Sequence, residues 1–465
     1  MAIKKLLKKL SVLFVLLCFF SSQCYAFISL EDEEIIGERI YLQVKKQGIL
    51  IQDDFVSKYI DQLGHYLIRP LQTKPFPFHF SVINKNVINA FASPGGYIYI
   101  FAGLINLTDN VDELAAVMCH EIGHVSARHI AKKIEQSEKL SYLTLAALLA
   151  GVLVGGRAAS GIAAISMGAS AQLQINFTRD EERQADELGF RYISASGFNP
   201  VAMYDILKKI TDQSLYALDR IPPFLLDHPV GAERLSNIQA MLSTYHPIPA
   251  TKEVIYFRKN FPIFKTLVYA QSKEVDNAKK YYMDVLKDDP ESPIANLGLG
   301  IVYMRLSEYK KAIECFKKTL NKWPDSIPVL TKLAVAYQNS GQNKKAIEVI
   351  NRALAIDDTN NHTLFLLGLS YENLKNYKKA LRIFKKLSYL KPVDEDVYYH
   401  LGITYGKLGK LALAHYNLGI YFSKLYSINK ARFHFLEAKR FAQGNKKLLN
   451  EITARLKSLG KIPKM

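Results

Sequence analysis

A spacing of 34 residues recurs through the C-terminal half of this 465-residue chain and restricts its fold more than any other feature. Five tyrosines follow the spacing without a break: Tyr269, Tyr303, Tyr337, Tyr371 and Tyr405. Five alanines follow it nine residues later: Ala278, Ala312, Ala346, Ala380 and Ala414. A unit of this length is two short antiparallel helices, in which a small residue lets the helices approach and an aromatic residue fills the gap. The spacing therefore predicts a row of stacked helix pairs, with the tyrosines in its core.

The repeated residues resemble the tetratricopeptide repeat. The resemblance covers five units, with a degenerate sixth around Phe422 and Phe435, and we expect the array to span residues 255–460. Such arrays form a concave groove for peptides or protein partners. The competing interpretation is a rigid arm that only positions the rest of the protein.

The residues suited to chemistry lie earlier, in the helical pattern Val111–Ile130. His120 and His124 are four residues apart, so both lie on one face of a helix and can reach a single Zn²⁺. Glu121 would stand beside the open coordination position, where it can take a proton from the attacking water. The alternative is a pair of surface histidines beside a chance glutamate, since only three of the five motif positions are fixed.

A third metal ligand is needed. The metzincin pattern fails, because Ala127 and Ile130 occupy the positions where it requires glycine and histidine. His129 is five residues after His124, about 140° round a continuous helix, so we expect it to face elsewhere and to be structural.

A later helix offers the gluzincin solution, in which a glutamate completes the site. Thr178 reads as an N-cap, and Glu182 and Asp186 follow on one face. Glu182 can bind the metal while Asp186 accepts a ring N–H from a ligand histidine. Glu181 and Glu187 are equally acidic, so the residues alone leave a solvated acidic face as the alternative.

Together these segments resemble the metallopeptidase family of the CaaX prenyl protease and the heat-shock protease HtpX, over roughly residues 30–245. The resemblance lies in Asn89–Ala92, Pro94–Ile98, Gly103–Leu104, Glu113–Ala116, His120–His124 and Thr178–Asp186. It implies one zinc ion per chain, with Glu182 as the third ligand. Thr178 and Gln184 depart from the usual serine and frequent glutamate, but neither is a ligand position.

His228 stands on a proline-rich loop, followed six residues later by Arg234. By resemblance, this histidine approaches the metal, either as a fourth ligand or as a donor to the oxyanion. A loop histidine can swing, and the fourth position of a catalytic zinc is open. A helix-initiating histidine without a catalytic part is the alternative, and Arg234 receives no role.

Two further segments carry expectations. Gly96, Tyr97 and Ile98 begin a β-rich run, which as an edge strand would hold an extended substrate by β-augmentation; a purely structural strand competes. The apolar stretch 140–171 is too short before its glycines to span a bilayer. We expect a buried helix or a lid there, with peripheral membrane contact as the alternative.

The first 26 residues have a basic start, an apolar core at Leu10–Phe20 and small residues before Ala26, typical of a cleavable signal peptide. An uncleaved anchor is the alternative. Export to the periplasm makes a nucleic-acid partner implausible, although the chain carries a net charge of +18. Residues 251–465 hold 38 basic and 19 acidic residues, so the excess lies in the repeats. We interpret it as a docking surface for acidic partners or an anionic envelope surface.

The expected fold is therefore mainly α: signal peptide 1–26, a gluzincin-type metalloprotease domain with a small β-sheet at 27–250, and a repeat solenoid at 255–460. Periplasmic members of the family with such repeats assist outer-membrane β-barrel assembly. The resemblance thus implies an endopeptidase acting on misfolded or stalled envelope proteins, with the assembly machinery in the groove. A second hypothesis is an assembly chaperone or scaffold whose latent protease activity is gated by His228.

Overall fold

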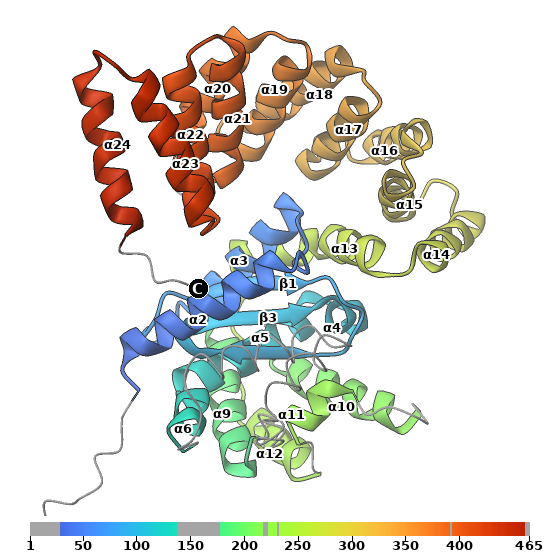
Figure 1. Ribbon diagram of the computed structural model, residues 1–465. Helices are drawn as coiled ribbons and strands as arrows, with labels where there is room; N and C mark the ends of the chain where they lie inside the picture. The colour runs from blue at the N-terminus through green and yellow to red at the C-terminus, as the bar shows by residue number, and fades with distance from the viewer. Residues whose placement is uncertain (1–27, 137–176, 217–221, 230–231, 391–392, 461–465) are drawn as a thin grey trace, which may run out of the picture. The chain divides into compact units, whose positions relative to one another are not determined.

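A computed structural model describes residues 28–136, 177–216, 222–229, 232–390 and 393–460 (Figure 1). The chain forms two compact units, Met1–Ser272 and Lys273–Met465. The expected fold class is confirmed, since the described residues are mainly helical with one small sheet. The expected signal peptide and the apolar stretch 140–171 lie outside the described residues. Among the residues that are described, none of the helices has the length and apolarity needed to cross a membrane.

The first unit is built from helices around a three-stranded sheet. Its strands are β1 (His79–Ile83), β2 (Ala90–Ser93) and β3 (Tyr97–Phe101), with the short helix η1 (Pro94–Gly96) between the last two. Its described helices are α2 (Leu30–Lys46), α3 (Asp54–Leu67), α4 (Ala102–Leu107), α5 (Val111–Ser126), α6 (His129–Gln136), α9 (Arg179–Ala195), α10 (Val201–Tyr216), α11 (Pro223–Asp227), α12 (Ala232–Ser243) and α13 (Lys252–Ser272).

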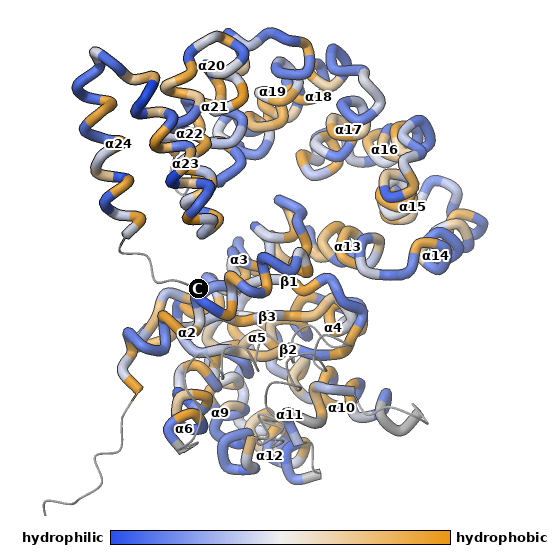
Figure 2. Tube along the Cα trace, viewed as in Figure 1, coloured by the Kyte–Doolittle hydropathy of each residue, from blue (hydrophilic) through white to orange (hydrophobic). Residues whose placement is uncertain are grey.

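The strand order corrects one expectation. The run that begins at Gly96 does form a strand, β3, but this strand is the centre of the sheet, parallel to β1 and antiparallel to β2. Its backbone groups are therefore used on both sides, and it cannot take up a peptide as an edge strand. The central strand β3 is largely apolar, as its colouring in Figure 2 shows, and its residues Ile98 and Ile100 are fully buried.

The turn between β2 and β3 needs its two glycines. Gly95 and Gly96 have φ of 74° and 83°, the left-handed region that residues with a Cβ rarely adopt. A Cβ on Gly95 would also lie 2.8 Å from the carbonyl oxygen of Glu33 in α2. The glycines thus let β2 reverse direction tightly beneath α2.

Helices α5 and α9 cross at close range because small residues occupy the crossing point. A Cβ on Gly123 of α5 would lie 2.7 Å from the carbonyl oxygen of Ala185 on α9. Asn110 caps α5 through the backbone N–H of Glu113, and Thr178 caps α9 through that of Glu181, as its sequence predicted. The crossing fixes α9 relative to α5, the two helices that carry the candidate ligands.

Helix α13 packs against α3 and α4 within the first unit. The Tyr59 hydroxyl donates to the Phe257 carbonyl oxygen at 2.8 Å, and the Tyr59 ring stacks on Phe264 at 4.4 Å between centroids. Arg258 forms two hydrogen bonds to the Asp112 carboxylate, at 2.7 and 3.1 Å, close to the N-terminus of α5. The 34-residue spacing extends back to Tyr269 in α13, yet the packing of this helix places it in the first unit.

The second unit is a row of antiparallel helix pairs. Its helices are α14 (Val275–Asp288), α15 (Pro293–Arg305), α16 (Tyr309–Lys322), α17 (Ile327–Asn339), α18 (Asn343–Ile356), α19 (Asn361–Asn373), α20 (Tyr377–Leu387), α21 (Glu395–Lys407), α22 (Leu411–Lys424), α23 (Ile428–Phe441) and α24 (Lys446–Leu459). The alanines of the 34-residue spacing are all buried, as the pattern predicts. Tyr337 and Tyr405 are buried, whereas Tyr303 and Tyr371 are half-buried and lie under the ammonium groups of lysines.

Aromatic side chains pack against glycines within these pairs. A Cβ on Gly300 or Gly368 would lie 2.5 Å from the ring of Phe316 or Phe384, respectively. Both rings are fully buried, so each glycine makes room for a core ring.

Candidate metal centre

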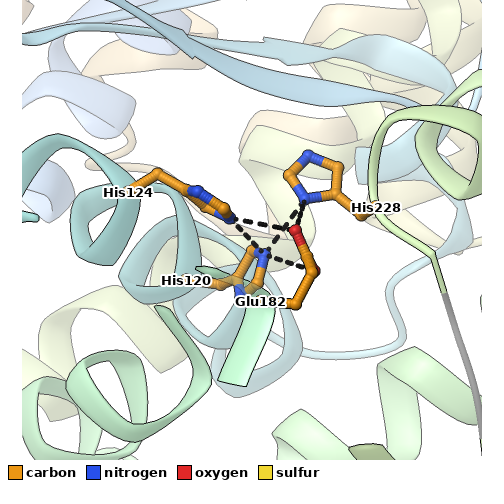
Figure 3. A group of neighbouring side chains, drawn as sticks. All are labelled: His120, His124, Glu182 and His228. Atoms are coloured by element: carbon orange, nitrogen blue, oxygen red, sulfur yellow. Dashed lines mark hydrogen bonds and ion pairs between the residues drawn. The ribbon is translucent and has the colours of Figure 1, made fainter. Parts of the chain in front are cut away.

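Three elements of the first unit bring four potential ligands together (Figure 3). Helix α5 carries His120 and His124, α9 carries Glu182, and His228 follows directly after α11. One ligand atom from each of the four lies within 4.8 Å of the other three. All four side chains are buried, which keeps water from competing for these atoms.

The individual distances show how the group converges. The Nε2 atoms of His120 and His124 are 3.1 Å apart. The distance from His124 Nε2 to Glu182 Oε1 is 3.3 Å. His228 Nδ1 lies 2.9 Å from Glu182 Oε1 and 3.2 Å from His120 Nε2. Three imidazoles and a carboxylate at such spacing are the donor set of a transition-metal site, and they suit zinc.

Behind the ligands, one cation holds two carboxylates. Asp186 Oδ1 lies 2.9 Å from His120 Nδ1, and Arg234 binds both oxygens of Asp186 at 2.8 Å. Arg234 Nη1 also lies 2.6 Å from Glu182 Oε2. The structure thus gives Arg234 a place that the sequence did not: it links the candidate ligand Glu182 to the residue that orients His120.

His129 is where the sequence interpretation was wrong, because it contacts the site instead of facing away. Its Nδ1 lies 3.0 Å from Nδ1 of His124, and its Nε2 lies 2.9 Å from Gln184 Oε1. The prediction assumed one continuous helix, but α5 ends at Ser126 and α6 restarts at His129, with Arg128 left-handed at φ 54° between them. No glycine marks this break, so the sequence carried no signal for it.

Glu121 has the environment of a general base. Its side chain is 1% exposed, and among the described residues neither carboxylate oxygen has a partner at full hydrogen-bond geometry, although the backbone N–H of Ala92 interacts with the carboxylate. His228 Nε2, also without such a partner, lies 3.6 Å from Glu121 Oε1. Burial raises the pKa of Glu121 above its ordinary value. A buried carboxylate that lacks full hydrogen bonds and lies beside four potential metal ligands is what a site for a metal ion and a water molecule would contain.

The charges of the site favour an ionised Glu182. Burial alone would raise the pKa of Glu182, but His228 and Arg234 outweigh burial and hold it far below its usual range. Burial would likewise lower the pKa of His228, yet the carboxylates of Glu182 and Glu121 raise it overall. Glu182 is therefore available as an anionic ligand.

Comparison with known proteins agrees with this geometry. The model of Peptidase family M48 matches residues 56–242, and models of tetratricopeptide repeats match residues 267–327 and, as the N-terminal repeat region of Psidin, residues 302–417. The match to the peptidase family contains all four candidate ligands. An M48 family assignment implies a metal, and the four-residue group is where this chain could hold it.

Three curated relatives match this chain over different lengths. The β-barrel assembly-enhancing protease of Yersinia pestis is 35% identical over 234 residues, covering 50% of this chain and 48% of the relative. The Escherichia coli K12 protein of that name is 34% identical over 236 residues, with the same coverage. A putative β-barrel assembly-enhancing protease of Vibrio cholerae is 30% identical over 301 residues, covering 57% of this chain and 62% of the relative.

The chain thus spans about half the length of the first two relatives in these matches. These matches confirm the resemblance drawn from the sequence motifs. The chain carries a metallopeptidase domain of family M48, followed by tetratricopeptide repeats.

Proposed function

We propose that this chain is an exported, zinc-dependent endopeptidase whose repeats bind a protein partner or substrate. One observation carries the proposal: the side chains of His120, His124 and Glu182 converge, and the buried carboxylate of Glu121 lies beside them. Zinc held by these three residues would supply a Lewis acid that polarises the scissile carbonyl and the attacking water. The family match and the names of the relatives support peptide-bond hydrolysis.

Glu121 is the proposed general base. It takes a proton from the attacking water and passes it to the leaving amine, so one carboxylate serves both halves of the reaction. The raised pKa of Glu121 suits this role, because an acceptor must bind the proton firmly enough to remove it from water. Asp186 and Arg234 orient His120 and Glu182, and they take no part in proton transfer.

The strand that binds the substrate is β2, in place of the strand beginning at Gly96. The Phe101 N–H donates to the Asn89 carbonyl oxygen at 3.0 Å, so this opposed pair is hydrogen-bonded. Antiparallel pairs alternate, and the N–H and C=O groups of Ala90 and Ala92 therefore point away from β3. No described strand pairs with this edge, and β2 packs against α5. An extended substrate added there would run along the helix that carries Glu121.

His228 supports a second candidate function, a chaperone or scaffold with latent protease activity. Its side chain is fully buried and its Nδ1 stands among the ligand atoms, the position of a fourth ligand. A fourth protein ligand would leave no coordination position for the attacking water. After a swing of the loop, the same imidazole could instead donate to the oxyanion, which is the assisting role.

The cell envelope is the proposed place of action, and misfolded or stalled outer-membrane proteins are the proposed substrates. The support is the signal-like N-terminus and relatives named for β-barrel assembly. The repeats would bind the assembly machinery or the substrate, and their basic excess suits an acidic partner or peripheral contact with an anionic membrane.

The test replaces Glu121 by glutamine in the full-length protein. We expect one bound zinc per chain and loss of peptide-bond cleavage by at least about 100-fold, the lower end of general-base contributions. Full cleavage by Glu121→Gln would exclude Glu121 as the base, and failure of the wild-type protein to bind zinc would refute the proposal.

A matched pair of variants separates the two functions in cells. If proteolysis matters, Glu121→Gln fails to restore outer-membrane protein maturation in a strain lacking the wild-type protein. If the scaffold matters, this variant restores maturation and a chain ending before Lys273 does not. The His228→Ala variant should cleave faster if His228 blocks the site, whereas a large loss of activity would assign it the assisting role.

A further inference from the structure

The two ligand histidines of α5 have different partners behind them. The Nδ1 atom of His120 lies 2.9 Å from the Asp186 carboxylate, which Arg234 neutralises. The Nδ1 atom of His124 lies 3.0 Å from another imidazole, that of His129. A neutral imidazole, unlike a carboxylate, can either donate or accept a hydrogen bond at Nδ1. The tautomer of His129 therefore decides whether it accepts from His124 or donates to it.

The protons along this second chain can be counted. His124 points its Nε2 at the other ligand atoms, so binding a metal there requires a bare Nε2 and a proton on Nδ1. Nδ1 of His129 must then accept that proton in a hydrogen bond, which requires a bare Nδ1. The proton of His129 is left on Nε2, which faces the Gln184 carbonyl oxygen at 2.9 Å. An amide oxygen can only accept, so each contact has one donor and one acceptor.

We propose that His129 is a positioning residue for the metal: a neutral imidazole, fixed in its Nε2–H tautomer by Gln184, which orients His124 and holds His124 Nε2 ready to bind zinc. The inference rests on the proposed zinc site and adds to it the His124–His129–Gln184 chain. The order is directional, because Gln184 fixes His129 and His129 fixes His124.

The local backbone is built to present this ring. Arg128 adopts φ 54°, which is unfavourable for a residue with a Cβ, and thereby turns the chain so that His129 faces back toward His124. The Arg128 guanidinium compensates by binding two groups of the N-terminal segment: Nε donates to Glu33 Oε1 at 2.7 Å and Nη2 to the Ile28 carbonyl oxygen at 2.8 Å. Glu33 is itself buried, so this anchor is fixed. The unfavourable backbone conformation of Arg128 is thus maintained directly before His129, and it fixes the direction in which the His129 ring points.

Two substitutions distinguish positioning from simple packing. His129→Leu introduces an apolar side chain of similar size, which fills the space of the ring but removes the acceptor for His124 Nδ1–H. His129→Asn is smaller, yet its Oδ1 can occupy the place of the ring Nδ1 and still accept. Lys132→Leu, on the exposed side of α6, is the control for changes to that helix.

The measurement is the zinc dissociation constant of the full-length protein, obtained by competition with a chromophoric chelator. Removal of a hydrogen-bond partner of a ligand histidine weakens metal binding by about 10- to 100-fold. We expect such a loss for His129→Leu, a loss of less than about 5-fold for His129→Asn, and no change for Lys132→Leu. The visible absorption of the Co²⁺-loaded protein should shift for His129→Leu alone, because His124 is no longer held in place.

The outcomes separate this inference from the proposed function. If the wild-type protein binds zinc and His129→Leu binds it equally tightly, His129 does not position the metal and the inference is wrong. If His129→Asn loses as much affinity as His129→Leu, packing rather than acceptance at Nδ1 explains the effect, and the inference is again wrong. Equal thermal unfolding of the metal-free variants establishes that all of them fold. Absence of zinc from the wild-type protein would instead overturn the proposed site itself.

Discussion

Replacement of Gly123 by alanine tests whether the crossing of α5 and α9 sets the metal geometry. The new Cβ would lie 2.7 Å from the Ala185 carbonyl oxygen and 3.1 Å from its Cα, whereas ordinary contact begins at 3.4 Å. Both neighbours are backbone atoms that cannot rotate away. The helices must therefore separate by about 0.7 Å at this point for ordinary contact to be regained.

This displacement exceeds what a metal site tolerates. Glu182 lies less than one helical turn from Ala185 on the same helix, so it moves with α9. Metal–ligand distances hold within about 0.2 Å, so a shift of this size removes good coordination by Glu182. We expect zinc affinity to fall by at least about 10-fold. The fold suffers less, because overpacking costs about 1–3 kcal/mol and alanine returns about 1 kcal/mol of helix propensity.

The assay compares zinc affinity with the stability of the metal-free protein. Gly406→Ala is the matched control, since Gly406 also lies in a helix but the nearest atom to its Cβ would be 3.8 Å away. That variant should bind zinc normally and be unchanged or slightly more stable. Zinc affinity within 2-fold of wild type in a folded Gly123→Ala protein would refute the reasoning, because the crossing distance would then not govern the site.

Three further predictions concern charge and packing. Arg234→Met should destabilise the metal-free first unit by about 3–5 kcal/mol in urea unfolding, because it leaves Asp186 and Glu182 buried without their cation; a loss below 1 kcal/mol would contradict this. Burial raises the pKa of Asp186, but Arg234 and His120 together outweigh burial and lower this pKa to about 2 from 3.8. The stability from this carboxylate is therefore complete above pH 4 and is lost as pH falls toward 2. Acid unfolding of the metal-free protein should show this loss of about 2 kcal/mol, and Arg234→Met should abolish it. Phe384→Ala should destabilise the repeats by about 3–5 kcal/mol, because it leaves a cavity over Gly368, and zinc affinity should stay normal. A loss of zinc affinity together with the loss of stability would contradict the division into two units.

Patterns with a strict period could be predicted from the sequence. The burial of Ala312 and its equivalents follows from a 34-residue unit, because a small residue at a helix crossing has one compatible environment. His120 and His124 lie on one face because α-helical spacing requires it, and Thr178 caps α9 because its side chain can accept from the first turn. These features depend on neighbours within a few residues or on a repeat.

Features set by distant partners could not be predicted. Whether the strand Tyr97–Phe101 is central or at an edge depends on β1 and β2, which the local β-rich pattern does not specify. The contact of His129 with His124 depends on a left-handed Arg128, which the buried Glu33 stabilises from 95 residues earlier. Arg234 stayed unassigned because its two carboxylate partners lie on another helix.

The packing of α13 within the first unit determines where a truncated form of the protein can end. A fragment that stops near Pro249, between α12 and α13, would lose Phe264 and Leu267, both fully buried, and would expose the Tyr59 ring that stacks on Phe264. Such a fragment would present a fresh apolar surface and tend to aggregate. An expression vector for the catalytic part should therefore run through Ser272, where the contacts of the first unit end. For the same reason, a chimera that receives this domain should keep its core intact only if it also receives α13.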